Sequence, residues 1–296
     1  MANQPEKLFK YCSISTAVQI LESRKLRWSS PSVFNDPLEL NHLTEANFDR
    51  DALLQATIKL ASSMIFSSSN PRGDTPLINA IKRWREEERF EDPEEAETVL
   101  GELLAKMVDQ RMLLVKQFVE TWQQYNKQTR ICCFTSRPDS VVAWDLFAQS
   151  HSGVCFRFDA SGDASAADAS PIEYRNQRPE LVDLRMQIDA ILYNQPMDDH
   201  FDFSQFLRIK PPSRKLEMEW RCFRKSPNVD IGSDFKQWTD DIEFQAEELS
   251  AVCFGIDIKD KDKEHIQRLL KGQYTNARSY QANLAAGKYD LEIQKL

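Results

Sequence analysis

Apolar residues recur along this chain with two kinds of spacing, which distinguish strand-like segments from a long helical block. Short alternating or continuous apolar runs predict strands over 8–12, 26–29, 130–135, 154–158, 172–174 and 251–258. Between residues 45 and 128 the apolar residues fall three and four positions apart, which predicts helices over 51–66, over 77–89 and from Pro93 to the polar stretch 123–128. Shorter helical patterns cover 15–21, 141–149, 181–193 and 262–270.

This order of elements indicates the α+β class. We expect residues 1–44 and 129–296 to form an α+β core and residues 45–128 to form a helical insert within the same domain. The apolar stripe of the insert needs a cover, which is either the strand-rich core or a second copy of the chain. Its members are Leu100, Leu104, Met107, Leu114, Phe118 and Trp122.

Charged residues alternate with apolar ones over residues 215–223, which predicts a strand. On a strand, Glu217, Glu219 and Arg221 share one face, and the other face holds Leu216, Met218, Trp220 and Cys222 as core. Two neighbouring carboxylates repel each other, and burying them is costly unless they are paired. The charged face is therefore either a solvated surface with an arginine pair or the lining of a polar cleft.

Composition places the chain among ordinary globular proteins. It has 296 residues, of which 41% are hydrophobic and 28% charged. No apolar run approaches the roughly 18 residues that a membrane span requires. The polar N-terminal residues 1–10 lack the apolar centre of a signal peptide. We expect a cytoplasmic protein.

The cysteines, the histidines and the net charge limit the kinds of site that the chain can carry. The six cysteines show no Cys-x-x-Cys pair and most lie in apolar contexts, so we expect reduced, buried thiols. The four histidines lack metal-ligand spacing, and we expect no metal site. A net charge of −8 does not favour binding to nucleic acid. Residues 208–225 are nonetheless basic, which indicates either an anionic ligand or simple balance of surface charge.

An ordered set of short motifs resembles a bacterial family known as domain-of-unknown-function family 2971. The matching motifs span nearly the whole chain, and the long insert at 45–128 departs from the family pattern. They are Leu8-Phe9-Lys10-Tyr11, Leu26 to Pro31, Phe34 to Pro37, Cys133 to Ser136, Trp144 with Phe147-Ala148, His151 to Phe158, and Lys215 with Glu217-x-Glu219-Trp220-Arg221.

The same order of parts distantly resembles an ADP-ribosyltransferase. In that family a first strand holds NAD, a middle strand ends in Ser, Thr or an aromatic residue, and a late strand carries the catalytic Glu, often as Glu-x-Glu. The resemblance implies a split antiparallel sheet, NAD as substrate, no metal, Glu219 as catalytic residue and Glu217 as general base. It places around NAD the residues Lys10, Tyr11, Ser29, Ser30, Thr135, Ser136 and Arg221.

Three functions follow from these patterns. The first is an NAD-cleaving, ADP-ribosyltransferase-like enzyme, such as a toxin or anti-phage effector, that modifies an unknown macromolecule or depletes NAD. The second is a non-catalytic module on the same scaffold that binds a nucleotide or a protein. The third is a hydrolase or nuclease with a divalent metal on Asp36, Glu217 and Glu219. Self-association through the 45–128 helices is a further possibility for a partner.

Overall fold

The chain forms two compact units in the structure, a computed structural model that describes residues 5–34, 36–39, 45–198, 200–226 and 234–296. The strand-rich unit comprises Met1–Asn41, Asn126–Arg178 and Ser204–Leu296. The helical unit comprises His42–Tyr125 and Pro179–Phe203. It is therefore wider than the insert expected at 45–128, because it also takes in 179–203, which the sequence pattern had left with the core.

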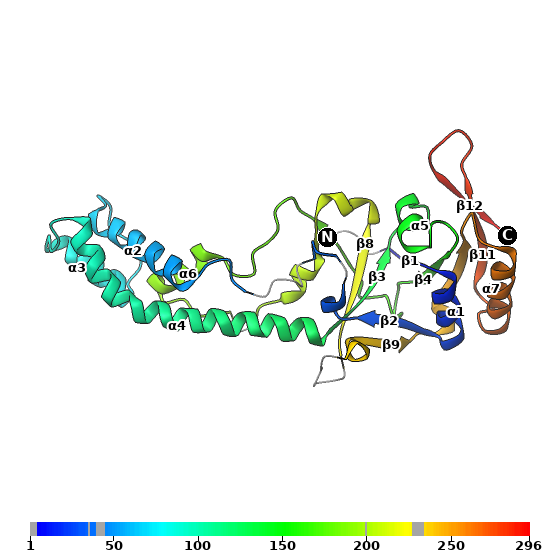
Figure 1. Cartoon of the computed structure of the whole chain (residues 1–296), viewed down its shortest axis with the longest axis horizontal. Coiled ribbons are helices and arrows are strands. Elements are labelled where there is room, and N and C mark those ends of the chain that lie inside the picture. Colours follow the sequence, from blue (N-terminus) through cyan, green and yellow to red (C-terminus); the bar gives the residue numbers. More distant parts are fainter. Residues whose placement is uncertain (1–4, 35, 40–44, 199, 227–233) are drawn as a thin grey trace. The chain divides into compact units, whose positions relative to one another are not determined.

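The strand-rich unit contains a ten-stranded sheet that is antiparallel except for one pair, β10 and β11. Eight strands follow one another in the order β12 (Leu291–Lys295), β11 (Arg278–Leu284), β10 (Leu249–Phe254), β4 (Val154–Asp159), β1 (Lys7–Cys12), β3 (Thr129–Thr135), β2 (Lys25–Ser29) and β9 (Thr239–Glu243). Strands and helices are mixed without regular alternation, so the predicted α+β class is confirmed (Figure 1).

The sheet branches at β3. Along its whole length β3 pairs with β8 (Glu219–Lys225), which in turn pairs with the short β5 (Ser170–Pro171). The same β3 also meets β1 at Thr135 and β2 at Ile131. The register sets Phe134 opposite Trp220 and Cys132 opposite Cys222, and all four side chains are buried in one core. The end of β3 and the start of β8 therefore lie next to each other.

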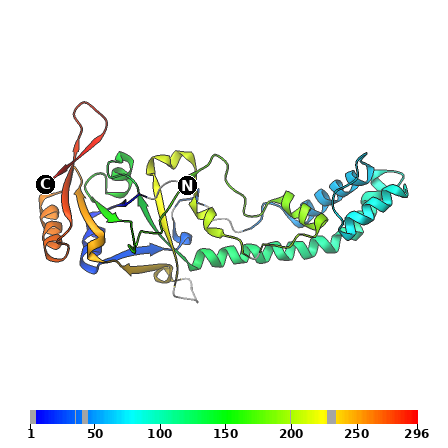
Figure 2. The same cartoon turned by 180° about the vertical axis from the view of Figure 1, so that it is seen from behind.

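Helices cover the two faces of the sheet. Residues of β4 alternate between two cores: Phe156 belongs to the larger one and Cys155 to the smaller one. Helices α1 (Ile14–Ser23) and α7 (Asp260–Gln273) lie side by side over the larger core (Figures 1 and 2). Helix α5 (Val141–Phe147) seals the smaller one with Trp144.

The helical unit has its own core. It is built by α2 (Arg50–Phe66), α3 (Pro76–Glu86), α6 (Leu184–Tyr193) and the first part of α4 (Pro93–Gln128). Leu100 and Leu104 of the predicted stripe are buried there, whereas Leu114 is exposed. Within this unit α2, α3 and α6 cover Leu100 and Leu104. Trp122 of the stripe is also buried, and its ring packs against Phe203. None of the helices in the described part of the chain combines the length and hydrophobicity needed to cross a membrane.

The six cysteines are distributed over five strands of the sheet. All six carry free thiols, and five of them are fully buried. Burial raises the pKa of the Cys12, Cys155 and Cys253 thiols, since the thiolate would lose its hydration. Such thiols behave as small apolar core residues.

Gly255, which follows β10, permits a close approach of two backbones. A Cβ at this position would lie 2.0 Å from the carbonyl oxygen of His151, and the Gly255 amide donates to the Gly153 carbonyl at 3.0 Å. We expect Gly255→Ala to lower the free energy of unfolding by about 1–3 kcal/mol, because the clash is with backbone that cannot rotate away. Denaturant unfolding measures this change.

Gly272 in α7 is the matched control. A Cβ added there meets nothing within 4 Å. Since alanine is the better helix former, Gly272→Ala should leave stability unchanged or raise it by up to about 1 kcal/mol. Equal effects of the two substitutions would contradict the close approach at Gly255.

Candidate functional site

A cavity of about 750 Å³ lies in the strand-rich unit, beside the junction of β3 and β8. Its size falls within the roughly 300–1,000 Å³ typical of small-molecule sites. One part of the wall is apolar and is formed by Phe9, Tyr11, Val33, Phe34, Cys133, Phe134, Ala143, Leu146 and Phe147. The rest is formed by Thr135 and eight charged residues, Lys10, Asp36, Glu39, Lys210, Arg214, Glu217, Glu219 and Arg221.

The prediction that Glu217 and Glu219 share the face of one strand is wrong. Residues Pro212–Glu217 form the 3-10 helix η4, and β8 begins only at Glu219. Leu216 and Met218, predicted as core, are 67% and 42% exposed. The reason is that β3 ends at Thr135, directly opposite Glu219, so the β3–β8 ladder does not continue to the residues before Glu219.

Met218 turns the chain between the two glutamates. It adopts the left-handed conformation, with φ 44° and ψ 46°. Its amide donates to the Lys215 carbonyl, and its own carbonyl accepts from the Ser136 amide at 3.2 Å. This turn lets both glutamate side chains reach the same ammonium group, although they belong to different elements.

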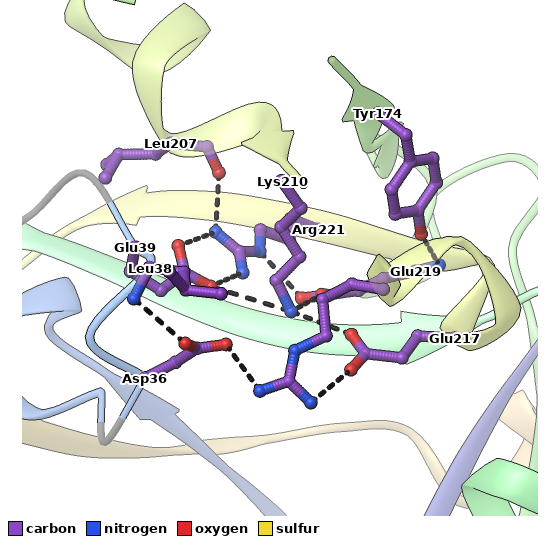
Figure 3. Close-up of polar contacts among 10 residues, drawn as sticks. Asp36, Leu38, Glu39, Tyr174, Leu207, Lys210, Glu217, Glu219 and Arg221 are labelled. Carbon is purple, nitrogen blue, oxygen red and sulfur yellow. Dashed lines mark hydrogen bonds and ion pairs between the residues drawn. The ribbon is translucent and has the colours of Figure 1, made fainter. Parts of the chain in front are cut away.

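That ammonium belongs to Lys210. It is carried by β7 (Ile209–Lys210), which pairs in parallel with β6 (Glu173–Tyr174) in a separate two-stranded sheet. Its Nζ lies 2.5 Å from Glu219 Oε2, 2.8 Å from Glu217 Oε2 and 3.6 Å from Glu39 Oε1 (Figure 3). One nearly buried cation therefore holds three carboxylates together.

Arg221 completes the buried part of the network. Its Nε donates to Glu219 Oε1 at 2.7 Å, and its two terminal nitrogens contact the Glu39 carboxylate at 2.5 and 3.1 Å. One of these nitrogens also donates to the Leu207 carbonyl at 2.6 Å. Arg221 was predicted to contact NAD. It does line the cavity, but its guanidinium is engaged by two carboxylates of the protein.

Arg214 and Asp36 form the outer part of the network. Arg214 on η4 lies 3.4 Å from Glu217 Oε1 and 3.1 Å from Asp36 Oδ2. The other oxygen of Asp36 accepts the Leu38 amide at 3.0 Å (Figure 3). Asp36 therefore joins a local turn to the cavity wall.

The network keeps Glu219 ionised. Burial by itself would raise the pKa of this carboxyl, but Arg221 and Lys210 outweigh burial and lower the pKa to about 2. For Lys210, burial favours the neutral amine, yet Glu219 and Glu39 hold its pKa above the ordinary value. Burial would also lower the pKa of Arg221, but the carboxylates of Glu219 and Glu39 outweigh burial and raise it. Glu219, Lys210 and Arg221 therefore keep their charges at neutral pH.

Tyr174 of β6 contacts Glu219 from the backbone side. Its hydroxyl accepts the Glu219 amide at 3.0 Å. The small β6–β7 sheet thus brings two groups, Lys210 and Tyr174, to the first residue of β8. Sequence reasoning assigned no site role to Tyr174, Glu39 or Lys210. The only signal was that Lys210 belongs to the basic stretch 208–225.

Lys10 and Tyr11, predicted for the first NAD-contacting slot, both line the cavity. Lys10 Nζ donates to the Cys133 carbonyl at 3.0 Å and lies 5.4 Å from the centre of the Phe134 ring. Tyr11 is largely a core residue: its ring packs edge-on against Trp144, and its hydroxyl donates to the Arg137 carbonyl at 2.8 Å. Burial raises the Tyr11 pKa far above its usual value, so the phenol stays neutral.

The predicted hydroxyl residues divide into two groups. Thr135 lines the cavity directly opposite Glu219 in the β3–β8 ladder, so the structure brings these two together. The other three, Ser29, Ser30 and Ser136, are not among the described residues that line the cavity. The buried Ser30 hydroxyl donates to the Asn126 carbonyl and accepts the Ser32 amide. It therefore serves to cap the 3-10 helix η1 (Pro31–Val33).

Known proteins give no further guide to this cavity. The chain matches no family model, no curated protein and no solved structure. The resemblances noted in the sequence therefore stay predictions.

The carboxylates of the cavity do not form a ready-made metal site. Within the described ranges, no group of three or more His, Cys, Asp or Glu side chains has the geometry to hold a metal ion. Asp36, Glu217 and Glu219, the proposed ligands of a metal-dependent hydrolase, each contact at least one cationic side chain. A divalent ion would have to displace those cations.

Proposed function

We propose that the protein binds NAD in this cavity and cleaves the bond between nicotinamide and ribose, as an ADP-ribosyltransferase-like enzyme. The observation that carries the proposal is a buried carboxylate, Glu219, which two cationic side chains hold in the wall of a cavity of ligand size. A fixed negative charge in a largely desolvated site is suited to stabilise a developing positive charge.

The chemistry assigns a task to each glutamate. Cleavage breaks the bond between the ribose C1′ and the nicotinamide nitrogen, and the electron pair leaves with nicotinamide. The ribose then carries an oxocarbenium-like positive charge, which the Glu219 carboxylate stabilises. Water or a macromolecular acceptor bonds to C1′, and Glu217, as the general base, takes the proton that it loses.

Other features of the cavity support NAD as the ligand. Phe9, Phe34, Phe134 and Phe147 offer aromatic surface for the flat rings of a dinucleotide. Glu219 lines the cavity, and its Oε1, which pairs with Arg221, has a second lone pair that can accept a ribose hydroxyl. The branch of the sheet at β3 is also in keeping with the split sheet that the ADP-ribosyltransferase resemblance implies.

One observation favours a second function, a non-catalytic binding module. Both oxygens of Glu219 are already engaged, by Arg221 and by Lys210, in a network that closes on itself. Such a network can serve to hold a rigid pocket in which a nucleotide binds without reacting. The two functions differ in a single measurable respect, the release of nicotinamide.

Nicotinamide release from NAD tests the proposal. We expect the wild-type protein to release nicotinamide, and Glu219→Gln to do so at least about a hundredfold more slowly, because the charge that stabilises the reacting ribose is gone. Glu173→Gln is the matched control, since Glu173 is an exposed carboxylate paired with Arg175. All three proteins should be assayed well below their unfolding temperatures.

Full activity of Glu219→Gln would remove the catalytic assignment. A wild-type protein that binds NAD but releases no nicotinamide, with water or with added acceptor proteins, would favour the binding module.

A further inference from the structure

The charges that line the cavity are balanced. Four cationic side chains, Lys10, Lys210, Arg214 and Arg221, face four carboxylates, Asp36, Glu39, Glu217 and Glu219. An anionic ligand must therefore either use a cation without a carboxylate partner or displace a carboxylate from its cation.

Asp36 is the carboxylate that is easiest to displace. Glu39, Glu217 and Glu219 each contact two cationic side chains and are less than 10% exposed. Asp36 has one cationic contact among the described residues, to Arg214 at 3.1 Å, and its side chain is 17% exposed. Its pair with Arg214 is thus the most hydrated of the cavity, and exposed ion pairs are the weakest.

Release of Asp36 costs little in local structure. Its Oδ1 accepts the Leu38 amide, and only Oδ2 contacts Arg214. The turn bond can therefore persist when the ion pair breaks. Arg214 is 36% exposed, so its guanidinium can turn toward a ligand while its contact to Glu217 is kept or exchanged.

Lys10 supplies a second cation on the cavity wall. Its ammonium donates to a backbone carbonyl and, within the described residues, lies within 4 Å of no carboxylate. Lys10 and Arg214 are therefore the two lining cations that a ligand with more than one negative charge can contact with the least loss of existing ion pairs. A diphosphate group is such a ligand. It carries more than one negative charge, and its oxygens can accept hydrogen bonds both from a planar guanidinium and from an ammonium group.

We propose that Asp36 is an internal competitor, which occupies the Arg214 guanidinium in the place that the diphosphate of the ligand takes on binding. The inference rests on the proposed function, since it names the part of NAD that Arg214 receives. Removal of the Asp36 charge from the cavity wall should therefore strengthen binding of the ligand.

The test is calorimetric titration with ADP-ribose and with inorganic pyrophosphate, at one low salt concentration. Asp36→Asn keeps an oxygen for the Leu38 amide and removes only the competing charge. We expect it to bind both ligands about two- to fivefold more tightly than the wild type, the range of an exposed ion pair. Arg214→Gln should bind both about tenfold more weakly, because it loses a charge-assisted contact.

Two controls separate this effect from a general change of charge. Asp241→Asn removes the carboxylate of Asp241 on β9, which forms an exposed pair with Arg27 on β2, and should leave both affinities unchanged. Adenosine carries no phosphate, so Asp36→Asn should not change its affinity. Unchanged or weaker binding of ADP-ribose by Asp36→Asn would overturn the inference, as would unchanged binding by Arg214→Gln or a wild-type protein that binds neither ligand.

The binding measurements test the role of Asp36 separately from the catalytic role of Glu219. Tighter binding by Asp36→Asn without any nicotinamide release would uphold the competitor and reject the enzyme. Nicotinamide release with unchanged binding by Asp36→Asn would do the reverse.

Discussion

Replacement of Arg221 by methionine is expected to lower the free energy of unfolding by about 3–5 kcal/mol, the cost of leaving buried carboxylates without their cation. Arg221 is 1% exposed and contacts both Glu39 and Glu219. Without it, Glu39 and Glu219 would each keep one cationic contact among the described residues, to Lys210. Urea unfolding followed by fluorescence and circular dichroism measures the change.

An exposed arginine provides the comparison. Arg27 pairs with Asp241 at 3.0 Å, and both side chains are about half exposed. Arg27→Met should cost no more than about 1 kcal/mol, because water hydrates both charges in either state. A double variant, Arg221→Met with Glu39→Met, should lose less than the sum of its single variants, since each removes the other's unpaired charge. Equal costs at Arg221 and Arg27 would show that the buried network does not hold the fold.

The stability that Glu219 contributes should depend on pH. Its pKa in the folded protein is about 2, below the 4.5 that is ordinary for glutamate. A lowered pKa stabilises the folded state above pH 4.5, and this contribution is lost as the pH falls toward 2. We therefore expect Glu219→Gln to be less stable than the wild type by roughly 3 kcal/mol at pH 7, and the difference to shrink below pH 4.5.

The free energy of unfolding of Glu219→Gln is subtracted from that of the wild type at each pH. The contributions of the other carboxylates, which both proteins share, then largely cancel. Glu173→Gln, at an exposed position, should match the wild type within about 1 kcal/mol at every pH. A difference between Glu219→Gln and the wild type that stays constant from pH 7 to pH 3 would contradict the assignment of the lowered pKa to Glu219.

Strand pairing explains where the sequence pattern predicted the fold and where it did not. The apolar run within 130–135 predicted the strand that became β3, and the later half of 215–223 became β8, because each of these segments has a partner along its length. Trp220 and Cys222 are buried as predicted. The alternation continues to Leu216, but β3 ends opposite Glu219 and no strand of the described residues pairs with 216–218. The two prolines at 211 and 212 favour a tight helical turn instead. Alternation indicates which residues suit a strand, not whether a neighbour is available.

The candidate site was only partly predictable for a similar reason. Glu217, Glu219 and Arg221 could be found because charges within an apolar segment are costly and therefore notable. Glu39 lies 182 residues from Arg221 in the chain, and nothing near it marks it as buried. Lys210 could be seen as basic but not as the centre of three carboxylates. Partners that meet only through the tertiary fold leave no local signal in one sequence.

An experimental structure of the protein with a bound non-hydrolysable NAD analogue would show whether Glu219 contacts the ribose of NAD in this cavity. We expect the analogue in the cavity lined by Phe34, Thr135 and Glu219, with a ribose hydroxyl within hydrogen-bond distance, about 2.6–3.2 Å, of a Glu219 carboxylate oxygen. An analogue bound elsewhere on the protein, or a cavity left empty at saturating concentrations of the analogue, would contradict it.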